Sequence, residues 1–278
     1  MSASANDFIV IDHRNEILSG SAGDLARRIC ARRYSAGADG LILIEKSQAA
    51  DFRVRFYNPN GNEFNTCGNG GRCAARFAFL HALAPSDMTI ETNIGVIDAH
   101  ITGNAVKLKF VSPAEIRLNV PFEFDGQTRS GHLVRLGEPH FIVAETNIGR
   151  IPFVPIARRI RHHEIFGTDG SNVHFIEPLS RNRLMIRSFE RGIEDETLAC
   201  GSGCIAASVS TFTGKQTDPP ITIEPQSGIP LTVHFQPGNN FQDLYLEGDA
   251  RLLYRGELTS EAREWKVPIP GYHNRFRF

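Results

Sequence analysis

Short runs in which apolar and polar residues alternate recur along the whole chain. Residues 52–56 read Phe-Arg-Val-Arg-Phe and residues 105–110 read Ala-Val-Lys-Leu-Lys-Phe. A period of two is typical of strands that bury one face against a core. Strands are therefore predicted for both runs and for eight further apolar segments, at residues 8–11, 41–44, 141–143, 173–176, 184–186, 221–223, 231–235 and 243–247.

Helices are predicted for only four segments, and two of them share one layout. The four are residues 23–33, 67–84, 154–163 and 200–213. Cys67-Gly-Asn-Gly and Cys200-Gly-Ser-Gly each precede an Ala-rich run, and about half of the 278 residues separate the two cysteines. Solenoid repeats span only roughly 20 to 50 residues, so this spacing predicts a duplicated domain. We expect an N-terminal half of residues 1–115 plus 260–278, and a C-terminal half of residues 116–259.

Composition and charge narrow the range of partners. Hydrophobic residues make up 41% and charged residues 22% of the chain, and 30 Lys plus Arg nearly balance 31 Asp plus Glu. No net charge attracts the chain to nucleic acid or to an anionic membrane, so neither is expected as a partner. The N-terminus has no signal-like apolar stretch, and no apolar run reaches 18 residues. We therefore expect a cytosolic protein that acts on a small molecule.

A cysteine that begins a helix has specific chemical uses. The first N–H groups of a helix lack internal partners and favour anions, and glycines allow a ligand to approach the backbone. A thiol at this position is expected to have a lowered pKa. Two such helix starts that face one substrate carbon could exchange its proton on opposite faces. Cys67 and Cys200 are therefore predicted to be an acid/base pair that inverts an α-carbon without a cofactor.

The other three cysteines are predicted to have structural roles. Cys73 and Cys204 lie inside apolar helical runs, and Cys30 lies in the predicted helix at residues 23–33. An odd number of cysteines also argues against a disulfide framework. Neither Cys-x5-Cys nor Cys-x3-Cys is a usual zinc-finger spacing, so no metal is predicted.

Longer stretches around Cys67 and Cys200 resemble the two active-site signatures of the diaminopimelate epimerase family. These stretches are residues 56–73 and 189–203, and shorter similarities occur at residues 6–8, 137–140 and 170–175. The resemblance implies an α/β (α+β) fold of two pseudo-symmetric domains. In that fold each domain is a mixed sheet wrapped around a central helix, and the active site lies in the cleft between the domains.

The resemblance also implies roles for individual residues. Cys67 and Cys200 become the acid/base pair, and the backbone N–H groups near each cysteine bind the reacting carboxylate, at Gly68, Asn69, Gly201 and Ser202. The remaining substrate contacts fall to Asn6, Asn58, Asn172, Glu190 and Arg191. His140 and Glu190 match positions that tune the thiols. The implied reaction interconverts LL- and meso-2,6-diaminopimelate, on the way to lysine and peptidoglycan precursors, with neither metal nor pyridoxal phosphate.

One departure from the family pattern leaves alternatives open. Glu138 stands where the family commonly has a substrate-binding Asn, and a carboxylate there would repel a distal carboxylate unless it is paired or turned away. A racemase of another amino acid, such as histidine, is the first alternative. A thiol redox or metal-binding protein without turnover is the second. A homodimer is compatible with the sequence, which does not determine the oligomeric state.

Overall fold

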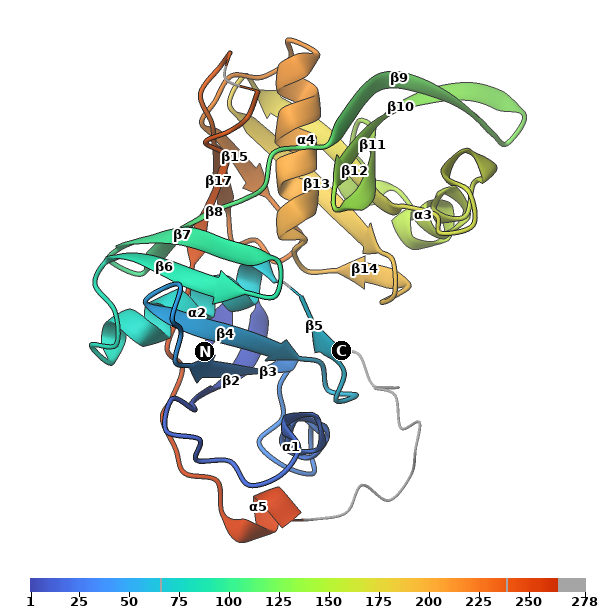
Figure 1. Ribbon diagram of the computed structural model, residues 1–278. Coiled ribbons are helices and arrows are strands. Elements are labelled where there is room, and N and C mark those ends of the chain that lie inside the picture. Colours follow the sequence, from blue (N-terminus) through green and yellow to red (C-terminus); the bar gives the residue numbers. More distant parts are fainter. Residues whose placement is uncertain (66, 239, 265–278) are drawn as a thin grey trace.

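Two helices, each enclosed by strands, organise the two halves of the molecule (Figure 1). The computed structural model describes residues 1–65, 67–238 and 240–264. Helix α2 (Gly68–Leu80) lies in the half formed by the first part of the chain, and α4 (Gly201–Thr213) lies in the other. The predicted plan of two mixed α/β halves, each wrapped around a central helix, is confirmed.

The first half holds a mixed sheet. Strand β2 pairs in parallel with β3, β4 in parallel with β6, and the remaining neighbours are antiparallel. The elements are β1 (Ser2–Ala3), β2 (Asn6–Asp12), α1 (Ala22–Ile29), β3 (Gly40–Glu45), β4 (Phe52–Tyr57), β5 (Glu63–Phe64), β6 (Asp87–Thr92), β7 (Gly95–Thr102) and β8 (Ala105–Lys109).

The second half repeats this order of strands. Strand β11 pairs in parallel with β12 and β13 in parallel with β15, whereas β14, β16 and β17 pair antiparallel with their neighbours, as β5, β7 and β8 do. The elements are β9 (Glu115–Phe124), β10 (Gln127–Leu136), β11 (Glu138–Ala144), η1 (Ile148–Arg150), α3 (Phe153–Arg161), η2 (Glu164–Phe166), β12 (Asn172–Ser180), β13 (Arg183–Glu190), β14 (Asp195–Thr197), β15 (Ile221–Glu224), β16 (Leu231–His234) and β17 (Tyr245–Asp249). The matching order confirms the duplication.

The halves are joined edge to edge and have separate cores. Strand β17 pairs antiparallel with β8, and Phe110 packs against the core of each half. Cys73 belongs to the core around α2 and Cys204 to the core around α4, and both are fully buried. Cys30 is buried in a smaller core beneath α1. Packing roles predicted for these three cysteines are confirmed.

Several predicted element bounds were wrong. Helix α1 ends at Ile29 and α2 at Leu80, so both helices are shorter than predicted. The hairpins β6–β7 and β9–β10 were not predicted at all. In β9 the alternation of residues is clear. Strand β9 is an edge strand that pairs only with β10 among the described strands, where a proline is tolerated.

The last described segment lies against the first half. Helix α5 (Ser260–Glu264) is beside α1 at the bottom of Figure 1, and the Arg28 guanidinium donates to the carbonyl of Arg263 at 3.1 Å. Residues 265–278 of the predicted tail lie outside the described residues, and the predicted division at 115/116 stays a prediction.

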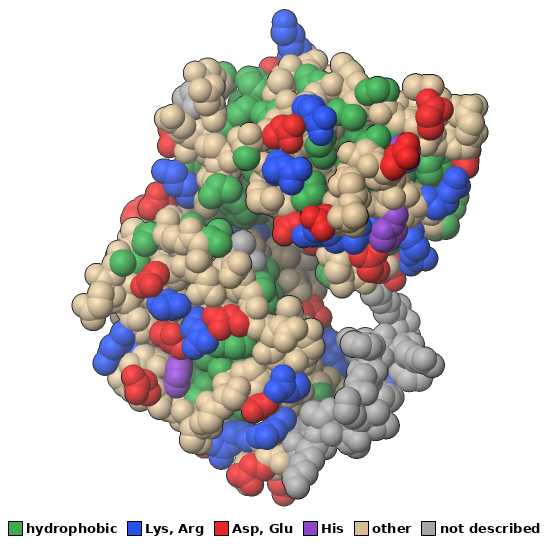
Figure 2. All heavy atoms as spheres, turned by 45° about the vertical axis from the view of Figure 1, so that its right-hand side comes forward, with side chains coloured by type: hydrophobic (Ala, Val, Ile, Leu, Met, Phe, Trp, Pro, Cys, Tyr) green, Lys and Arg blue, Asp and Glu red, His purple; other side chains and the backbone are tan. Residues whose placement is uncertain are grey.

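Figure 2 shows two lobes with positive and negative side chains interspersed on the face drawn. No helix among the described residues is long and apolar enough to cross a bilayer.

Candidate active site

Cys67 and Cys200 are the N-caps of the two central helices. Both have extended backbone conformations, and each sulfur accepts a hydrogen bond from the N–H three residues on, at 3.3 Å from Gly70 and 3.4 Å from Gly203. The sequence placed both cysteines at helix starts because Cys-Gly-x-Gly precedes each Ala-rich run. The structure has them there, with each sulfur against the N-terminal turn.

The two helix starts lie side by side. A Cβ added at Gly68 would be 3.7 Å from Leu246 Cδ2, and a Cβ added at Gly201 would be 2.9 Å from the same methyl carbon. Leu246 is in β17, the strand that joins the halves. Both helix N-termini therefore meet at one buried side chain, and their favourable potentials for an anion act on the same region.

Glu190 is close to both cysteines. It is at the end of β13, and its carboxyl group accepts a hydrogen bond from the Thr197 hydroxyl. Enclosure by the protein raises the pKa of this carboxyl group. After burial, which is the main cause, its charge also raises the pKa of the Cys200 thiol, and its effect on the pKa of Cys67 has the same direction but is small.

The sequence-based expectation of lowered thiol pKa values was wrong in direction. Burial raises the pKa of Cys67, and burial together with Glu190 raises that of Cys200 well above its ordinary value. The N–H donors of Gly70 and Gly203 and the charge of Arg72 act in the opposite sense but are smaller. A helix start lowers a thiol pKa only where solvation of the thiolate is retained. Cys200 is buried and Cys67 is half-buried, so the loss of solvation is stronger at Cys200.

A buried pair of histidines adjoins Cys200. His140 Nδ1 is 2.9 Å from His174 Nε2, and His174 Nδ1 is 2.9 Å from Ser188 Oγ. Neither histidine is more than 1% exposed, and burial lowers the pKa of His140 to about 3 and that of His174 well below its usual range. Both rings are therefore neutral at physiological pH. One ring nitrogen of each histidine and the Cys200 sulfur all lie within 4.8 Å of one another.

His174 and Ser188 were missed by the sequence analysis. His174 is a polar residue within the apolar run of β12, and Ser188 is its antiparallel partner on β13. A polar side chain on the buried face of a predicted strand was the available signal. The hydrogen bond to His140 could not be anticipated, because His140 comes from β11 in a parallel pairing.

A second cluster joins Asn172, Arg191 and Glu138. Asn172 Oδ1 accepts from the backbone N–H of Arg191 at 2.9 Å, and Asn172 Nδ2 donates to the carbonyl of Pro139 at 3.2 Å. The Arg191 guanidinium forms an ion pair with the Glu138 carboxylate. Glu138, the departure from the family pattern, is therefore paired with one of the residues predicted to bind substrate.

On the side of Cys67, Asn69 connects the start of α2 to β2. Asn69 Nδ2 donates to Asn6 Oδ1 at 3.4 Å, and Asn6 Nδ2 donates to Asp39 at 2.7 Å. The fully buried Arg72, which the sequence analysis did not select, donates to Asn69 Oδ1 at 2.9 Å and to Ser4 Oγ at 2.8 Å. These contacts fix the side chain of Asn69 and place a cation near Cys67.

Ser202 and Asn58 are less closely connected to the other predicted site residues. Ser202 Oγ is 3.6 Å from the Cys200 sulfur, a long contact. Asn58 lies in the turn after β4, where its backbone N–H donates to the Asn62 carbonyl and its own carbonyl accepts from Gly61. The contacts described for Asn58 are those of a turn residue, and its predicted role in binding substrate stays a prediction.

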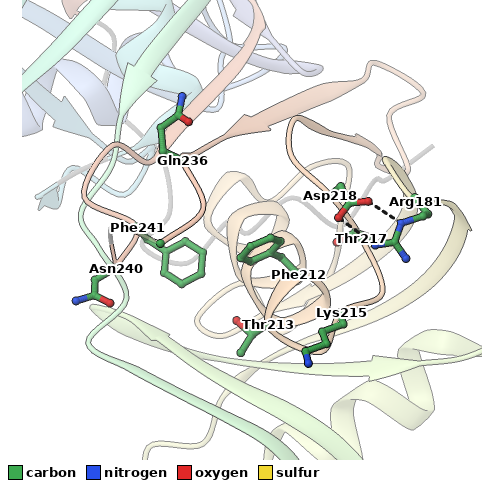
Figure 3. Close-up of a pocket in the computed structure, with 10 residues that line it drawn as sticks. Arg181, Phe212, Thr213, Lys215, Thr217, Asp218, Gln236, Asn240 and Phe241 are labelled. Carbon is green, nitrogen blue, oxygen red and sulfur yellow. Dashed lines mark hydrogen bonds and ion pairs between the residues drawn. The ribbon is translucent and has the colours of Figure 1, made fainter.

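A cavity of about 500 Å³ lies away from these residues. It is lined by Phe212 and Thr213 in the last turn of α4 and by Lys215 just after it, with the ion pair of Arg181 and Asp218 on one side (Figure 3). Cys200 is at the opposite end of this 13-residue helix, about 20 Å away at 1.5 Å per residue. This cavity is therefore separate from the candidate active site.

Comparison with known proteins identifies relatives that match most of the chain. The family model for diaminopimelate epimerase matches residues 1–112 and 132–253. A diaminopimelate epimerase from Chlorobaculum tepidum is 39% identical over 266 residues, which cover 93% of this chain and all of the relative. One from Aquifex aeolicus is 35% identical and covers 95% of this chain and 98% of the relative. The chain belongs to the diaminopimelate epimerase family. It is accordingly an isomerase.

Solved structures place this epimerase-family member in a wider fold group. A PhzF-family phenazine biosynthesis protein from Bacillus anthracis superposes with a TM-score of 0.68 at 16% identity, over 90% of this chain and 95% of that one. A probable proline racemase from Agrobacterium radiobacter superposes with a TM-score of 0.66 at 14% identity, over 89% and 88%. At these identities the likeness concerns the fold alone.

Proposed function

We propose that this member of the diaminopimelate epimerase family interconverts LL- and meso-2,6-diaminopimelate by proton transfer between Cys67 and Cys200. The observation that carries the proposal is the meeting of two cysteine-capped helix starts at Leu246, within reach of one substrate. Relatives named diaminopimelate epimerase that match almost the full chain support the choice of substrate.

The proposed chemistry needs one thiolate and one thiol at a time. A sulfur anion removes the α-proton from one face, the C–H electron pair passes into the carboxylate as an enolate, and the opposite thiol delivers its proton to the other face. The backbone N–H groups at Gly68, Asn69, Gly201 and Ser202 stabilise the charge that grows on the carboxylate. After turnover the two sulfurs have exchanged protonation states, which suits the reverse reaction.

Glu190 and His140 are proposed to control the protonation of the two thiols. Burial raises the pKa of Glu190, and the charge of Glu190 acts on the Cys200 thiol, so its carboxylate can take the thiol proton as substrate binds. The neutral His140 ring lies within 4.8 Å of the Cys200 sulfur. A neutral imidazole adds no charge that would hold the thiolate too tightly to act as a base.

The ion pair of Glu138 and Arg191 matches the distal end of the proposed substrate. That end of diaminopimelate is a zwitterion, with a carboxylate for the Arg191 fork and an ammonium for Glu138. The departure at Glu138 is thus compatible with this substrate, because its charge is balanced by Arg191 before binding and by the ammonium afterwards.

The test is to incubate the purified protein with LL-diaminopimelate in deuterium oxide and to follow meso product and α-deuterium by chiral separation and mass spectrometry. We expect both to appear. Exchange in histidine or another amino acid, with none in diaminopimelate, would support the alternative racemase instead. Stoichiometric disulfide between Cys67 and Cys200 in the active form would support a redox role.

The proposed setting is the cytosol, where a reducing environment keeps the five free cysteines of the structure as thiols. There the reaction would serve lysine and peptidoglycan precursor synthesis. The proposed partner is the small amino-acid substrate rather than nucleic acid or membrane, and a homodimer is proposed for test by sedimentation.

A further inference from the structure

We propose that His140, His174 and Cys200 form a binding site for a thiophilic divalent cation, with Zn²⁺ the best match, and that its occupation reversibly inhibits the enzyme. The three ligand atoms lie within 4.8 Å of one another, and all three residues are buried. They come from β11, β12 and the start of α4. The spacing of the cysteines predicted no metal, because ligands that only folding brings together leave no such spacing in the sequence.

The distances suit a tetrahedral ion. Zinc binds imidazole nitrogen at about 2.0–2.1 Å and thiolate sulfur at about 2.3 Å, which separates neighbouring ligand atoms by roughly 3.3–3.6 Å. The two histidine nitrogens are 2.9 Å apart, and no pair in the cluster exceeds 4.8 Å. Shifts of about an ångström would complete three protein ligands and leave a fourth position open, as in sites that hold an exchangeable water.

The protonation of the cluster also favours a cation. A neutral imidazole can bind metal through one ring nitrogen, and the proton shared between His140 Nδ1 and His174 Nε2 would have to move to the other nitrogen of its ring before both atoms bind the ion. Cys200 would exchange its S–H bond for an S–Zn bond and release one proton to solvent. The Cys200 thiolate would balance one of the two charges of the ion, and the neighbouring Glu190 carboxyl group would balance the other if the ion favours its ionised form.

The surroundings already orient one ligand. Ser188 Oγ is hydrogen-bonded to His174 Nδ1 at 2.9 Å, which leaves Nε2 directed at His140 and the cluster. A partner on the far nitrogen is a regular feature of metal-binding histidines. Gly203 provides the space for the ring, because an added Cβ would be 2.3 Å from His174 Cε1.

Occupation would remove Cys200 from proton transfer. Binding depends only on the cluster, whereas inhibition rests on the proposed function, so the two are measured separately. Binding is measured with Co²⁺ as a spectroscopic probe on the full chain, followed by displacement with Zn²⁺. We expect one ion per chain, the intense visible bands of four-coordinate cobalt, charge transfer from one thiolate, and release of about one proton.

Variants distinguish this site from capture by the two catalytic sulfurs. His174→Asn should weaken binding at least tenfold, and Ser188→Ala should weaken it less, because it keeps all three ligands. Cys67→Ser should keep the affinity and the charge-transfer intensity. The matched control His100→Asn removes an exposed histidine paired with Asp87 and should change nothing. Zn²⁺ should also abolish epimerase turnover, and a chelator should restore it.

Three results would overturn the inference. Absence of a stoichiometric ion, unchanged affinity in a folded His174→Asn variant, or loss of binding in Cys67→Ser would each exclude this cluster. If His174→Asn does not fold, unchanged affinity in Ser188→Ala together with charge transfer from two thiolates would do so. Cobalt binding as expected in a protein that does not turn over diaminopimelate would instead contradict the proposed function and leave the metal site standing.

Discussion

The contact between His174 and the start of α4 can be tested with Gly203→Ala. Gly203 donates its backbone N–H to the Cys200 sulfur, and a Cβ at this position would be 2.3 Å from His174 Cε1 and 2.7 Å from Nδ1. Carbon atoms in contact are normally about 3.5–4.0 Å apart. The ring must therefore move by more than an ångström, or α4 must withdraw.

Either movement would lower the free energy of unfolding. The ring is fully buried and is held by hydrogen bonds to His140 and Ser188. Overpacking of a core usually costs about 1–3 kcal/mol, and one lost buried hydrogen bond adds about 1 kcal/mol. The gain in helix propensity from Gly to Ala offsets at most about 1 kcal/mol. We expect a net loss of about 2 kcal/mol in the free energy of unfolding and a large loss of turnover.

The assay is urea denaturation beside epimerase kinetics. Gly149→Ala is the matched control, because no atom lies within 4 Å of its added Cβ, and its stability should stay within about 0.5 kcal/mol of the parent. In a His174→Ala background the cost of Gly203→Ala should largely disappear, since the clashing ring is gone. A Gly203→Ala protein with the stability and turnover of the parent would refute the reasoning.

Other predictions concern protonation and the distal end of the substrate. The pKa of His140, lowered to about 3, makes the free energy of unfolding decline as the pH falls below about 6.5. His140→Gln should remove about 2 kcal/mol of the decline between pH 7 and pH 5, measured by denaturation. An equal decline in both proteins would contradict this prediction. Because burial raises both thiol pKa values, kcat/KM should rise with pH beyond neutrality, and a plateau from pH 6 would count against that. Glu138→Gln should lower kcat/KM for diaminopimelate roughly three- to tenfold, and unchanged or improved kinetics would show that Glu138 does not bind the ammonium.

The duplicated plan was predictable because both halves carry the same local sequence pattern. Cys-Gly-x-Gly before each Ala-rich run marked both central helices and both N-caps. Most strands followed from short apolar or alternating runs, and alternation arises where only one face of a strand is buried. The hairpin β9–β10 was not predicted, although its first strand alternates and Pro121 is compatible with an edge strand.

The environment of the two cysteines was less predictable, because it depends on tertiary contacts. His174 on β12 and Ser188 on β13 adjoin Cys200 and were not predicted, whereas the resemblance implied Glu190. Arg72 could have been noticed as a cation one turn after Cys67, but its complete burial could not. Local sequence thus indicates where the thiols are, and the packing decides how they ionise.

Isotope partitioning during the first turnovers tests the central claim most directly. LL-diaminopimelate is converted in deuterium oxide, and α-deuterium is measured separately in the remaining substrate and in the meso product at low conversion. Two opposed sulfurs predict deuterium in the product and protium in the unreacted substrate, with turnover lost in both Cys67→Ser and Cys200→Ser. Protium carried into the product, or deuterium entering both pools equally from the start, would contradict the account.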